Sequence, residues 1–577
     1  RVLFRSAKNN LGTLLMENEK YEDAILLFKE VINKNPKFFK AYSNLATVFR
    51  RLGKVKEAEN LNKLSLQIEP NNPSALNNIG LLLMDENKFN LAINQFLKSI
   101  QFEKNSKTIK NLGIAYQRNY EYKKALNQYQ LSLNINPNDA KTYCSIGSCF
   151  KELKEFNNAI EAFDKALNLE KNNIYALSQK ISTERQICLW ENDFDIDKLN
   201  LKLTSYDQYI DPRSIMYLAD DLEIEQKLAR KYFKNNFVRV ANKISFSVKT
   251  KIRVGYYSAD LITHAVTILI IRLFEIYDSN KFEIYVYNFG RNKDDKYTER
   301  IKRGVTIYRD VRNYTDSQIV DLSRKDEIDI AIDLMGYTKN CRPSIFSMRV
   351  APIQISYLGF TGTMGTSAID YIIADKVLIK ENEKDFYDEE IIYLKNSPLC
   401  FDDTLKDSWN IKRREFYDLP EKGFIFSCFN NSYKISKKEF DAWMTILKKV
   451  ENSYLWLYVQ NQEAKRNLIK EAEYRNVDDE KIIFAEKVSL EEHFSRQKLS
   501  DLFLDTFNHN AGSTGALALY GGLPIITLYG NTYHSRMSAS LLINLGLDEL
   551  ISYSLDEYIE KTIKISTNKI YYSKIKS

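Results

Sequence analysis

The pattern of apolar and polar residues changes its period near residue 250. Before that point, apolar residues recur at helical spacing in segments of helix length. From Lys251 onward, short β-rich segments alternate with helical ones. A purely helical period predicts an all-α region, whereas alternating strands and helices predict parallel sheets with helices on both faces. The chain is therefore expected to combine an α region with an α/β region.

The all-α region repeats itself five times. A pair of one aliphatic and one small residue marks each unit, at Leu11-Gly12, Leu45-Ala46, Ile79-Gly80, Leu112-Gly113 and Ile146-Gly147. Successive pairs lie 34 residues apart, except for one step of 33. A second small residue follows at Ala24, Ala58, Ala92, Ala125 and Ala159. Small residues let two helices approach closely, so residues 1–174 are predicted to form an α-solenoid of helix pairs.

Two runs of alternating strands and helices make up the rest. The strand-like segments are 252–258, 282–289, 328–335 and 353–359 in the first run, and 424–429, 454–459, 481–486 and 502–506 in the second. They predict two Rossmann-like lobes, 251–410 and 411–577, after a helical connector at 175–250. The connector contains an acidic run, Asp193 to Asp197, which is expected to be a solvated turn and not a metal site.

The turn after segment 502–506 is the first candidate site. Within 502–529, a short helix is predicted to begin at about Ser513, and a second apolar strand is predicted to follow it. Helix starts leave backbone N–H groups unpaired at the positive end of the helix dipole. Gly512 and Gly515 allow close approach to the backbone, while Ser513 and Thr514 add hydroxyl donors. This is a candidate phosphate site, although such turns also simply join strands to helices in many α/β domains.

Other candidate residues share one kind of location, beyond the end of a strand. Lys434 follows segment 424–429, where a lysine could neutralise a diphosphate. A turn rich in glycine and threonine, 359–366, follows another strand. Each signal is weak alone, but the common location favours one binding site, since ligands of such lobes bind at the carboxyl ends of strands. The histidines all lie in the lobes, at His264, His493, His509 and His534.

Composition excludes several classes of protein. Hydrophobic residues make up 44% of the chain and charged residues 28%, which describes a globular protein. The net charge of +7, from 83 basic and 76 acidic side chains, is too small a bias to predict a nucleic-acid partner. Six scattered cysteines suggest neither a zinc site nor a disulfide framework. This fits a reducing compartment, and no apolar segment predicts a membrane span, so a cytoplasmic location is expected.

The repeats resemble the tetratricopeptide repeat (TPR). The most specific segments of the lobes are KIRVGYYSADLITH, DLMGYTKNCRPSIFSMRVAPIQISYLGFTGTMG, FNNSYKIS, EEHFSRQKLSDLFLDT and GSTGALALYGGLPIITL. Together with the repeats they resemble the O-linked N-acetylglucosamine transferase family, glycosyltransferase family 41, including its SPINDLY-like branch. The resemblance covers nearly the whole chain.

The resemblance implies both an architecture and an activity. The expected fold is a TPR α-solenoid followed by a GT-B pair of lobes. The implied reaction is an inverting, metal-independent transfer of N-acetylglucosamine from UDP-GlcNAc to Ser or Thr of proteins or peptides held by the repeats. No cofactor is implied. The expected partners are acceptor proteins and a nucleotide sugar, without nucleic acid or membrane, and a homo-oligomer through the repeats is a further candidate.

Several residues acquire roles from this resemblance by position. Lys434 matches the lysine that steadies the donor diphosphate. His264 matches an active-site histidine near sugar and acceptor that has been proposed as the general base. Gly362 and Thr363 form a candidate acceptor or sugar loop, and no metal ligand is implied. The other implied donor-binding residues are Asn431, His493, Arg496, Gly512, Ser513, Thr514 and Gly515.

Three positions depart from the family pattern. Gly512 stands where a histidine is usual, Leu517 where an acidic residue commonly holds the ribose, and Leu490 where a lysine is expected. Gly512 is similar to SPINDLY-type enzymes, some of which use GDP-fucose, whereas Arg496 favours the branch that uses UDP sugars. UDP-GlcNAc is therefore expected, with GDP-fucose as an alternative donor. A second class of function is a catalytically weak TPR adaptor that binds nucleotide or partner proteins.

Family members continue with further helix beyond the segment that ends this chain. The second lobe is therefore expected to be truncated at Ser577. The large insertion found between the lobes of animal members has no room here, which makes the chain similar to bacterial members.

Overall fold

The computed structural model describes residues 2–190, 210–237, 244–246, 249–290, 294–405 and 412–576. The chain forms two compact units, Arg1–Lys180 and Ile181–Ser577. The acidic run at 193–197 lies outside the described residues. Among the helices that the structure describes, none is both long and apolar enough to cross a membrane.

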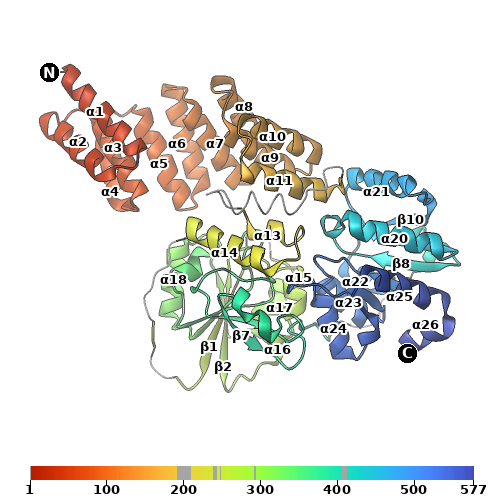
Figure 1. The fold of residues 1–577 in the computed structure, drawn as a ribbon. Coiled ribbons are helices and arrows are strands. Elements are labelled where there is room, and N and C mark those ends of the chain that lie inside the picture. Colours follow the sequence, from red (N-terminus) through yellow and green to blue (C-terminus); the bar gives the residue numbers. More distant parts are fainter. Residues whose placement is uncertain are drawn as a thin grey trace. The chain divides into compact units, whose positions relative to one another are not determined.

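The first unit is a row of helix pairs, as the repeats predict (Figure 1). The pairs are α1 (Val2–Glu17) with α2 (Tyr21–Lys34), α3 (Phe39–Arg51) with α4 (Val55–Ile68), α5 (Pro73–Asp85) with α6 (Phe89–Phe102), α7 (Ser106–Arg118) with α8 (Tyr122–Ile135), and α9 (Ala140–Glu152) with α10 (Phe156–Leu169). A further helix, α11 (Ile174–Gln186), follows them. The turn inside each pair has one residue in the left-handed region, at Glu19, Gly53, Asn87, Tyr120 and Lys154.

The small residues of the repeat make room for an aromatic ring. A Cβ added at Gly80 would lie 2.5 Å from the ring of Phe96, and one added at Gly113 would lie 2.6 Å from the ring of Tyr129. Gly12 and Gly147 face Phe28 and Phe163 in the same way. The glycine on the first helix and the ring on the second therefore form one steric unit, repeated along the solenoid.

Asparagine side chains connect neighbouring repeats. Asn78 donates to the carbonyl oxygen of Ser43 (2.8 Å), and Asn111 donates to Oδ1 of Asn77 (3.0 Å). These amides are thus engaged between repeats.

The second unit begins with helices that lead into two sheets. The described helices of the connector are α13 (Pro212–Ile215) and α14 (Leu222–Asn236), which follow α11. The side chains of Asp211 and Asp221 cap the starts of α13 and α14 by accepting backbone N–H bonds. The described part of the connector thus contains helices α13 and α14.

The first lobe is a seven-stranded parallel sheet in the order β3-β2-β1-β4-β5-β6-β7. Its strands are β1 (Ile252–Ser258), β2 (Phe282–Asn288), β3 (Ile307–Asp310), β4 (Ile330–Asp333), β5 (Ile353–Ser356), β6 (Tyr371–Ala374) and β7 (Glu390–Tyr393). Its helices are α15 (Ala265–Ile270), α16 (Leu273–Ile276), α17 (Lys296–Gly304), α18 (Asp316–Lys325) and α19 (Ser344–Ser347).

The second lobe is a six-stranded parallel sheet in the order β10-β9-β8-β11-β12-β13. Its strands are β8 (Phe424–Cys428), β9 (Ser453–Tyr458), β10 (Ile482–Ala485), β11 (Leu502–Leu504), β12 (Ile525–Leu528) and β13 (Ile551–Ser552). Its helices are α20 (Lys437–Lys449), α21 (Gln462–Tyr474), α22 (Leu490–Gln497), α23 (Ser513–Tyr520), α24 (Met537–Leu545), α25 (Leu555–Thr567) and α26 (Lys569–Lys576).

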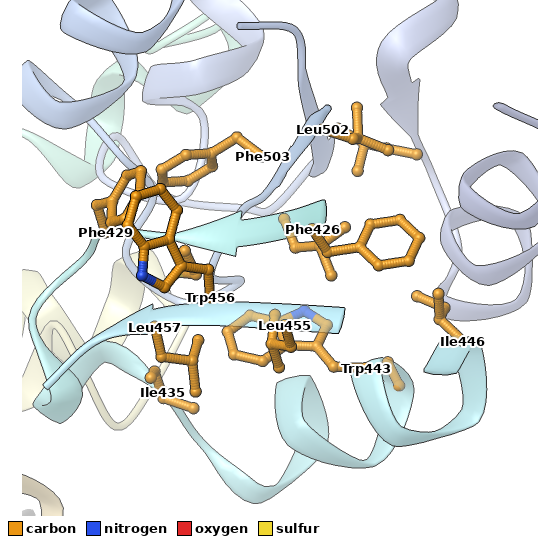
Figure 2. Packing of buried hydrophobic residues seen from close by; sticks show 14 of the residues in the cluster. Phe426, Phe429, Ile435, Trp443, Ile446, Leu455, Trp456, Leu457, Leu502 and Phe503 are labelled. Atoms are coloured by element: carbon orange, nitrogen blue, oxygen red, sulfur yellow. The ribbon is translucent and has the colours of Figure 1, made fainter. Parts of the chain in front are cut away.

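The core of the second lobe explains why its strands are apolar on both faces. Figure 2 shows Trp443 and Ile446 of α20 packing toward the strands, beside Leu455 of β9 and Phe426 of β8. Trp456 lies on the same strand as Leu455 and is also fully buried. Strands of parallel sheets with helices on both faces read as continuous apolar runs because neither face meets water.

The predicted fold class is confirmed, and every predicted strand is present. Four further strands, β3, β6, β7 and β13, escape prediction from sequence. β3 and β7 lie at the two edges of the first sheet and are only half-buried, so their residues include charged and polar ones. β13 has two residues, which is too short for any period.

Replacing Gly80 with alanine tests the packing of the repeats. Although alanine favours a helix, its Cβ would meet the Phe96 ring, so we expect a loss of about 1–3 kcal/mol of local stability. Hydrogen exchange followed by mass spectrometry should show faster exchange in α5 and α6. The double variant Gly80→Ala/Phe96→Leu, which removes the ring, should recover part of the protection. Unchanged exchange in the single variant would contradict this packing.

Candidate active site

The strand order of the second sheet reverses between β8 and β11. Ligands of open α/β sheets bind at such a switch point, outside the carboxyl ends of the strands. Lys434 lies there, in the short helix η3 (Ser432–Lys434) after β8, and the loop 505–512 follows β11 and leads into α23. Nζ of Lys434 donates a hydrogen bond to the carbonyl oxygen of Asn510 (3.0 Å). The structure thus brings the lysine and the approach to the helix start together.

Buried polar groups fix the loop 505–512. The Asp505 carboxylate is fully buried and accepts the backbone N–H of Ala511 (2.8 Å) and the hydroxyl of Thr527 (2.8 Å). Asn510 donates its amide to the carbonyl oxygen of Thr506 (2.6 Å). These buried hydrogen bonds hold the loop in one shape, so the Asn510 carbonyl is a fixed acceptor for Lys434.

The start of α23 presents unpaired donors. Within the described residues, neither the backbone N–H groups nor the hydroxyls of Ser513 and Thr514 make a hydrogen bond. Both residues are half-buried. The predicted donor-binding Gly515, one position further, is buried, and its N–H already donates to the carbonyl oxygen of Ala511 (3.1 Å). A Cβ at Gly512 would collide with the terminal methyl group of the Met537 side chain. Because residue 512 has no side chain, the backbone N–H groups at the start of the helix stay accessible, and the Met537 side chain packs beside them.

The surroundings of Lys434 lower the pKa of its ammonium. Desolvation lowers its pKa to about 8, although the buried Asp505 carboxylate acts in the opposite direction. The ammonium has three donors, and within the described residues only one of them is used. A desolvated ammonium with open donors next to a helix start is suited to bind an anion.

His493 and Arg496 lie on one face of α22. Nε of Arg496 donates to Nδ1 of His493 (3.1 Å), and another guanidinium nitrogen donates to the carbonyl oxygen of Glu486 (2.6 Å). Arg496 also lies over the rings of Phe429 and Trp456, 5.2 and 5.6 Å from their centroids. Desolvation lowers the pKa of both Arg496 and His493, that of His493 to about 3, so the histidine is neutral.

His264 belongs to the first lobe and caps α15. Its Nδ1 accepts the backbone N–H of Val266 (3.4 Å) and lies 3.7 Å from Oδ2 of Asp260. Helices α15 and α23 contact each other, and Val266 and Ala516 share one core cluster. The helix that His264 caps is thereby packed against the helix that begins at Ser513. The His264 side chain is 44% exposed, which leaves it open to a substrate.

The remaining predicted residues differ in accessibility. Asn431 is exposed, and its amide donates to the Tyr433 hydroxyl (3.3 Å). Gly362 and Thr363 are buried, and the Thr363 hydroxyl donates to the Glu389 carboxylate (2.7 Å). The loop at 359–366 is thus tied to the first lobe by its own hydrogen bonds, and the hydroxyl of Thr363 is already engaged.

Sequence reasoning missed groups that meet only in the fold. Asp505 and Asn510 shape the loop that faces Lys434. Tyr217, from the connector, places its ring 4.7 Å from that of Tyr433 and 5.3 Å from that of His509. The signal available in the sequence was the run of polar residues in 505–510 directly after an apolar strand. Nothing local marks Tyr217, because its neighbours come from distant parts of the chain.

A helix-pair solenoid followed by two doubly wound parallel lobes, with a cationic site at a switch point, is the architecture of a TPR-bearing GT-B glycosyltransferase. The chain belongs to glycosyl transferase family 41, whose model matches residues 230–406 and 399–577. Residues 140–173 match the tetratricopeptide repeat, and residues 6–112 match a model described as TT21 fifth ARM repeats domain. In the described residues, no group of three or more potential ligands is arranged to hold a metal ion.

Curated relatives include plant proteins. The chain is 34% identical over 329 residues to the probable UDP-N-acetylglucosamine–peptide N-acetylglucosaminyltransferase SEC of Arabidopsis thaliana. The aligned residues cover 55% of this chain and 33% of that relative. It is 26% identical over 323 residues to the SPINDLY protein of Solanum lycopersicum, whose name gives the same probable activity. Here the aligned residues cover 55% of this chain and 34% of the relative. The matched part thus spans about a third of the length of these relatives.

A solved structure shares the whole architecture. A mutant O-GlcNAc transferase of Thermobaculum terrenum, in which methionine replaces a lysine, matches with a TM-score of 0.61 at 23% identity, covering 93% of this chain and 91% of that one. At this identity the likeness establishes the fold, solenoid and lobes included.

Trace acylation of amines at different pH values tests the state of Lys434. Because desolvation destabilises the ammonium, Lys434 is protonated below about pH 8 and becomes a free, nucleophilic amine above it. Its labelling, read by peptide mass spectrometry, should rise with a midpoint near 8, against about 10.4 for an ordinary lysine. Asp505→Asn should lower the midpoint further, since it removes a charge that favours the ammonium. A midpoint near the ordinary value would contradict the desolvated site.

Proposed function

We propose that the chain transfers a sugar from a nucleotide diphosphate donor to Ser or Thr hydroxyls of proteins, with UDP-GlcNAc as the donor. The observation that carries the proposal is the hydrogen bond that holds the Lys434 ammonium against Asn510, beside the unpaired donors at the start of α23. The names of the curated relatives, peptide N-acetylglucosaminyltransferases, support the choice of sugar and of acceptor class.

The proposed reaction is a single displacement with inversion. The acceptor oxygen forms a bond to the anomeric carbon while the bond from that carbon to the diphosphate oxygen breaks on the opposite face. Negative charge grows on the diphosphate as it leaves. Lys434 and the N–H and hydroxyl donors from Gly512 to Thr514 stabilise that charge without a metal or other cofactor. In this proposal His264 takes the acceptor proton, and its exposure supports contact with an incoming hydroxyl.

The nucleotide is proposed to lie over α22. His493 is neutral there, and within the described residues the buried Arg496 guanidinium has no carboxylate partner. A neutral imidazole and a fixed guanidinium can hydrogen-bond to the carbonyl oxygens of a uracil ring. Asn431, exposed at the start of η3, is proposed to contact the donor from the other side. GDP-fucose is the alternative donor, which Gly512 favours.

The repeats are proposed to bind the acceptor protein. A solenoid offers an extended concave surface that is suited to a peptide in extended conformation. A cytoplasmic location, an absence of nucleic-acid and membrane partners and a homo-oligomer through the repeats belong to the same proposal. Gly362 and Thr363 are buried, so they are proposed to support the part of the site that binds the acceptor without contacting solvent.

A nucleotide-binding adaptor without turnover is the second candidate function. Leu517 is buried, Leu490 packs against the core of the first lobe, and Met537 fills the space beside Gly512. Apolar groups thus occupy three positions where polar contacts to a donor are usual, which favours weaker donor binding.

Replacing Lys434 with alanine tests the catalytic assignment. Loss of one positioned donor to the leaving diphosphate should lower kcat by about 10²- to 10³-fold. Transfer is measured by incubating the full chain with UDP-GlcNAc and a protein lysate and counting modified peptides by mass spectrometry. Lys437→Ala, an exposed lysine three positions further along, is the matched control and should keep wild-type turnover. A Lys434→Ala variant that is folded by circular dichroism and retains turnover would refute the assignment.

Calorimetry with UDP and GDP separates the candidate donors and functions. We expect UDP to bind at least about tenfold more tightly than GDP, a difference of about 1.4 kcal/mol. Arg496→Lys, which keeps the charge but loses the planar fork, should weaken UDP binding. The reverse order of affinities would favour a guanosine-linked sugar. Binding of UDP without any transfer would favour the adaptor. Binding of neither nucleotide would refute the assignment of a donor site.

A further inference from the structure

Asp220, in the turn between α13 and α14, binds a loop of the second lobe. Its carboxylate accepts the backbone N–H groups of Asn531 (2.8 Å) and Thr532 (3.0 Å). It also accepts the hydroxyls of Thr532 (2.8 Å) and Ser535 (2.6 Å). Hydrogen bonds to an ionised acceptor are the stronger kind, and a carboxylate can accept about four of them. The loop 530–535 is therefore held to the connector by a saturated carboxylate.

A glycine permits this close contact. A Cβ at Gly530 would lie 2.7 Å from Oδ2 of Asp220 and would collide with the Ser535 side chain. Any larger residue at this position would push the loop away from the carboxylate. A second acidic side chain of the connector, Glu225, lies 3.2 Å from Nε2 of His534 in the same loop.

The same loop reaches the candidate active site through the backbone. The carbonyl oxygen of His534 accepts the N–H of Asn510 (2.8 Å), and the carbonyl oxygen of Asn510 accepts Nζ of Lys434 (3.0 Å). Since both bonds are made by Asn510, a displacement of the loop 530–535 changes the place of the acceptor that orients Lys434. Asp220 is thus linked to the lysine through its hydrogen bonds to Thr532 and Ser535, the backbone of 532–535, and the two hydrogen bonds of Asn510.

The connector is anchored to the first lobe at its other end. Arg230 on α14 forms an ion pair with Asp388, with nitrogen–oxygen distances of 2.7 and 2.9 Å. Gln226 donates its amide to the carbonyl oxygen of Asp385 (2.9 Å). α14 is therefore fixed on the first lobe, while the turn that precedes it holds the loop of the second lobe.

We propose that Asp220 is a positioning residue for Lys434. It fixes the loop 530–535, the loop fixes Asn510, and Asn510 orients the ammonium toward the donor diphosphate. The inference rests on the proposed function for the identity of that ligand. The alternative is that Asp220 only fastens the connector, in which case its loss lowers stability and leaves Lys434 unchanged in folded molecules.

The test compares Asp220→Asn with Asp221→Asn in the full chain. Asp221 is the exposed neighbour that caps α14 by accepting the N–H of Ile224, a role that asparagine fills equally well. For Asp220→Asn we expect kcat to fall about 10- to 100-fold with the acceptor KM unchanged, because the displaced lysine serves mainly the transition state. Asp221→Asn should keep both wild-type values. Activities are expressed per folded molecule, measured from the melting curve of each variant.

A second readout needs no nucleotide. Trace acylation of Lys434 at fixed pH should change by about threefold or more in Asp220→Asn, which corresponds to half a pKa unit, and not in Asp221→Asn. Thr532→Val, which removes one of the bonds to Asp220, should change the labelling in the same direction by less. Wild-type labelling and wild-type kcat in Asp220→Asn would overturn the proposal, even if its melting temperature falls. If the wild-type chain transfers no sugar, the proposed function fails, and the labelling comparison alone decides the role of Asp220.

Discussion

A single hydrogen bond, from the Lys434 ammonium to the Asn510 carbonyl, joins the two halves of the candidate site. A desolvated ammonium is costly unless its donors are used, and the lowered pKa of Lys434 reflects that cost. Within the described residues the lysine keeps open donors, and so does the start of α23. An anionic diphosphate would satisfy both sets of donors at once. The rest of the second lobe can be understood as the framework that keeps these two elements side by side.

Topology supplies that framework. β8 and β11 are neighbours in the sheet, although β9 and β10 lie between them in the chain. Parallel strands end at the same edge, so the segments that follow β8 and β11 must meet there. The buried Asp505 carboxylate then folds the loop 505–512 tightly enough to present the Asn510 carbonyl to Lys434. The lobe thus uses regular architecture for placement and buried polar groups for the final orientation.

The repeats follow a different logic, in which each contact is local. Gly80 faces Phe96 sixteen residues later, and the same spacing recurs between Gly12 and Phe28 and between Gly147 and Phe163. Because the glycine and the aromatic ring of each contact belong to the two helices of one repeat, the same packing can recur in every repeat. The groups around the candidate site have no such local partner: Tyr217 meets Tyr433 and His509 only after three separate segments have converged.

The sequence by itself determined most of the elements, their order and the family. Period and spacing are local properties, and they predicted the helix pairs, nine apolar strands and the helix at Ser513. They also singled out Lys434 as a residue beyond a strand. Edge strands such as β3 and β7 were lost because half-buried strands carry charged residues. Only the tertiary structure decided that Lys434 meets Asn510, that Met537 fills the space beside Gly512, and that Asp220 binds the loop 530–535. These contacts join residues far apart in the chain, and no periodic pattern records which distant groups the sheet order and the buried hydrogen bonds bring together.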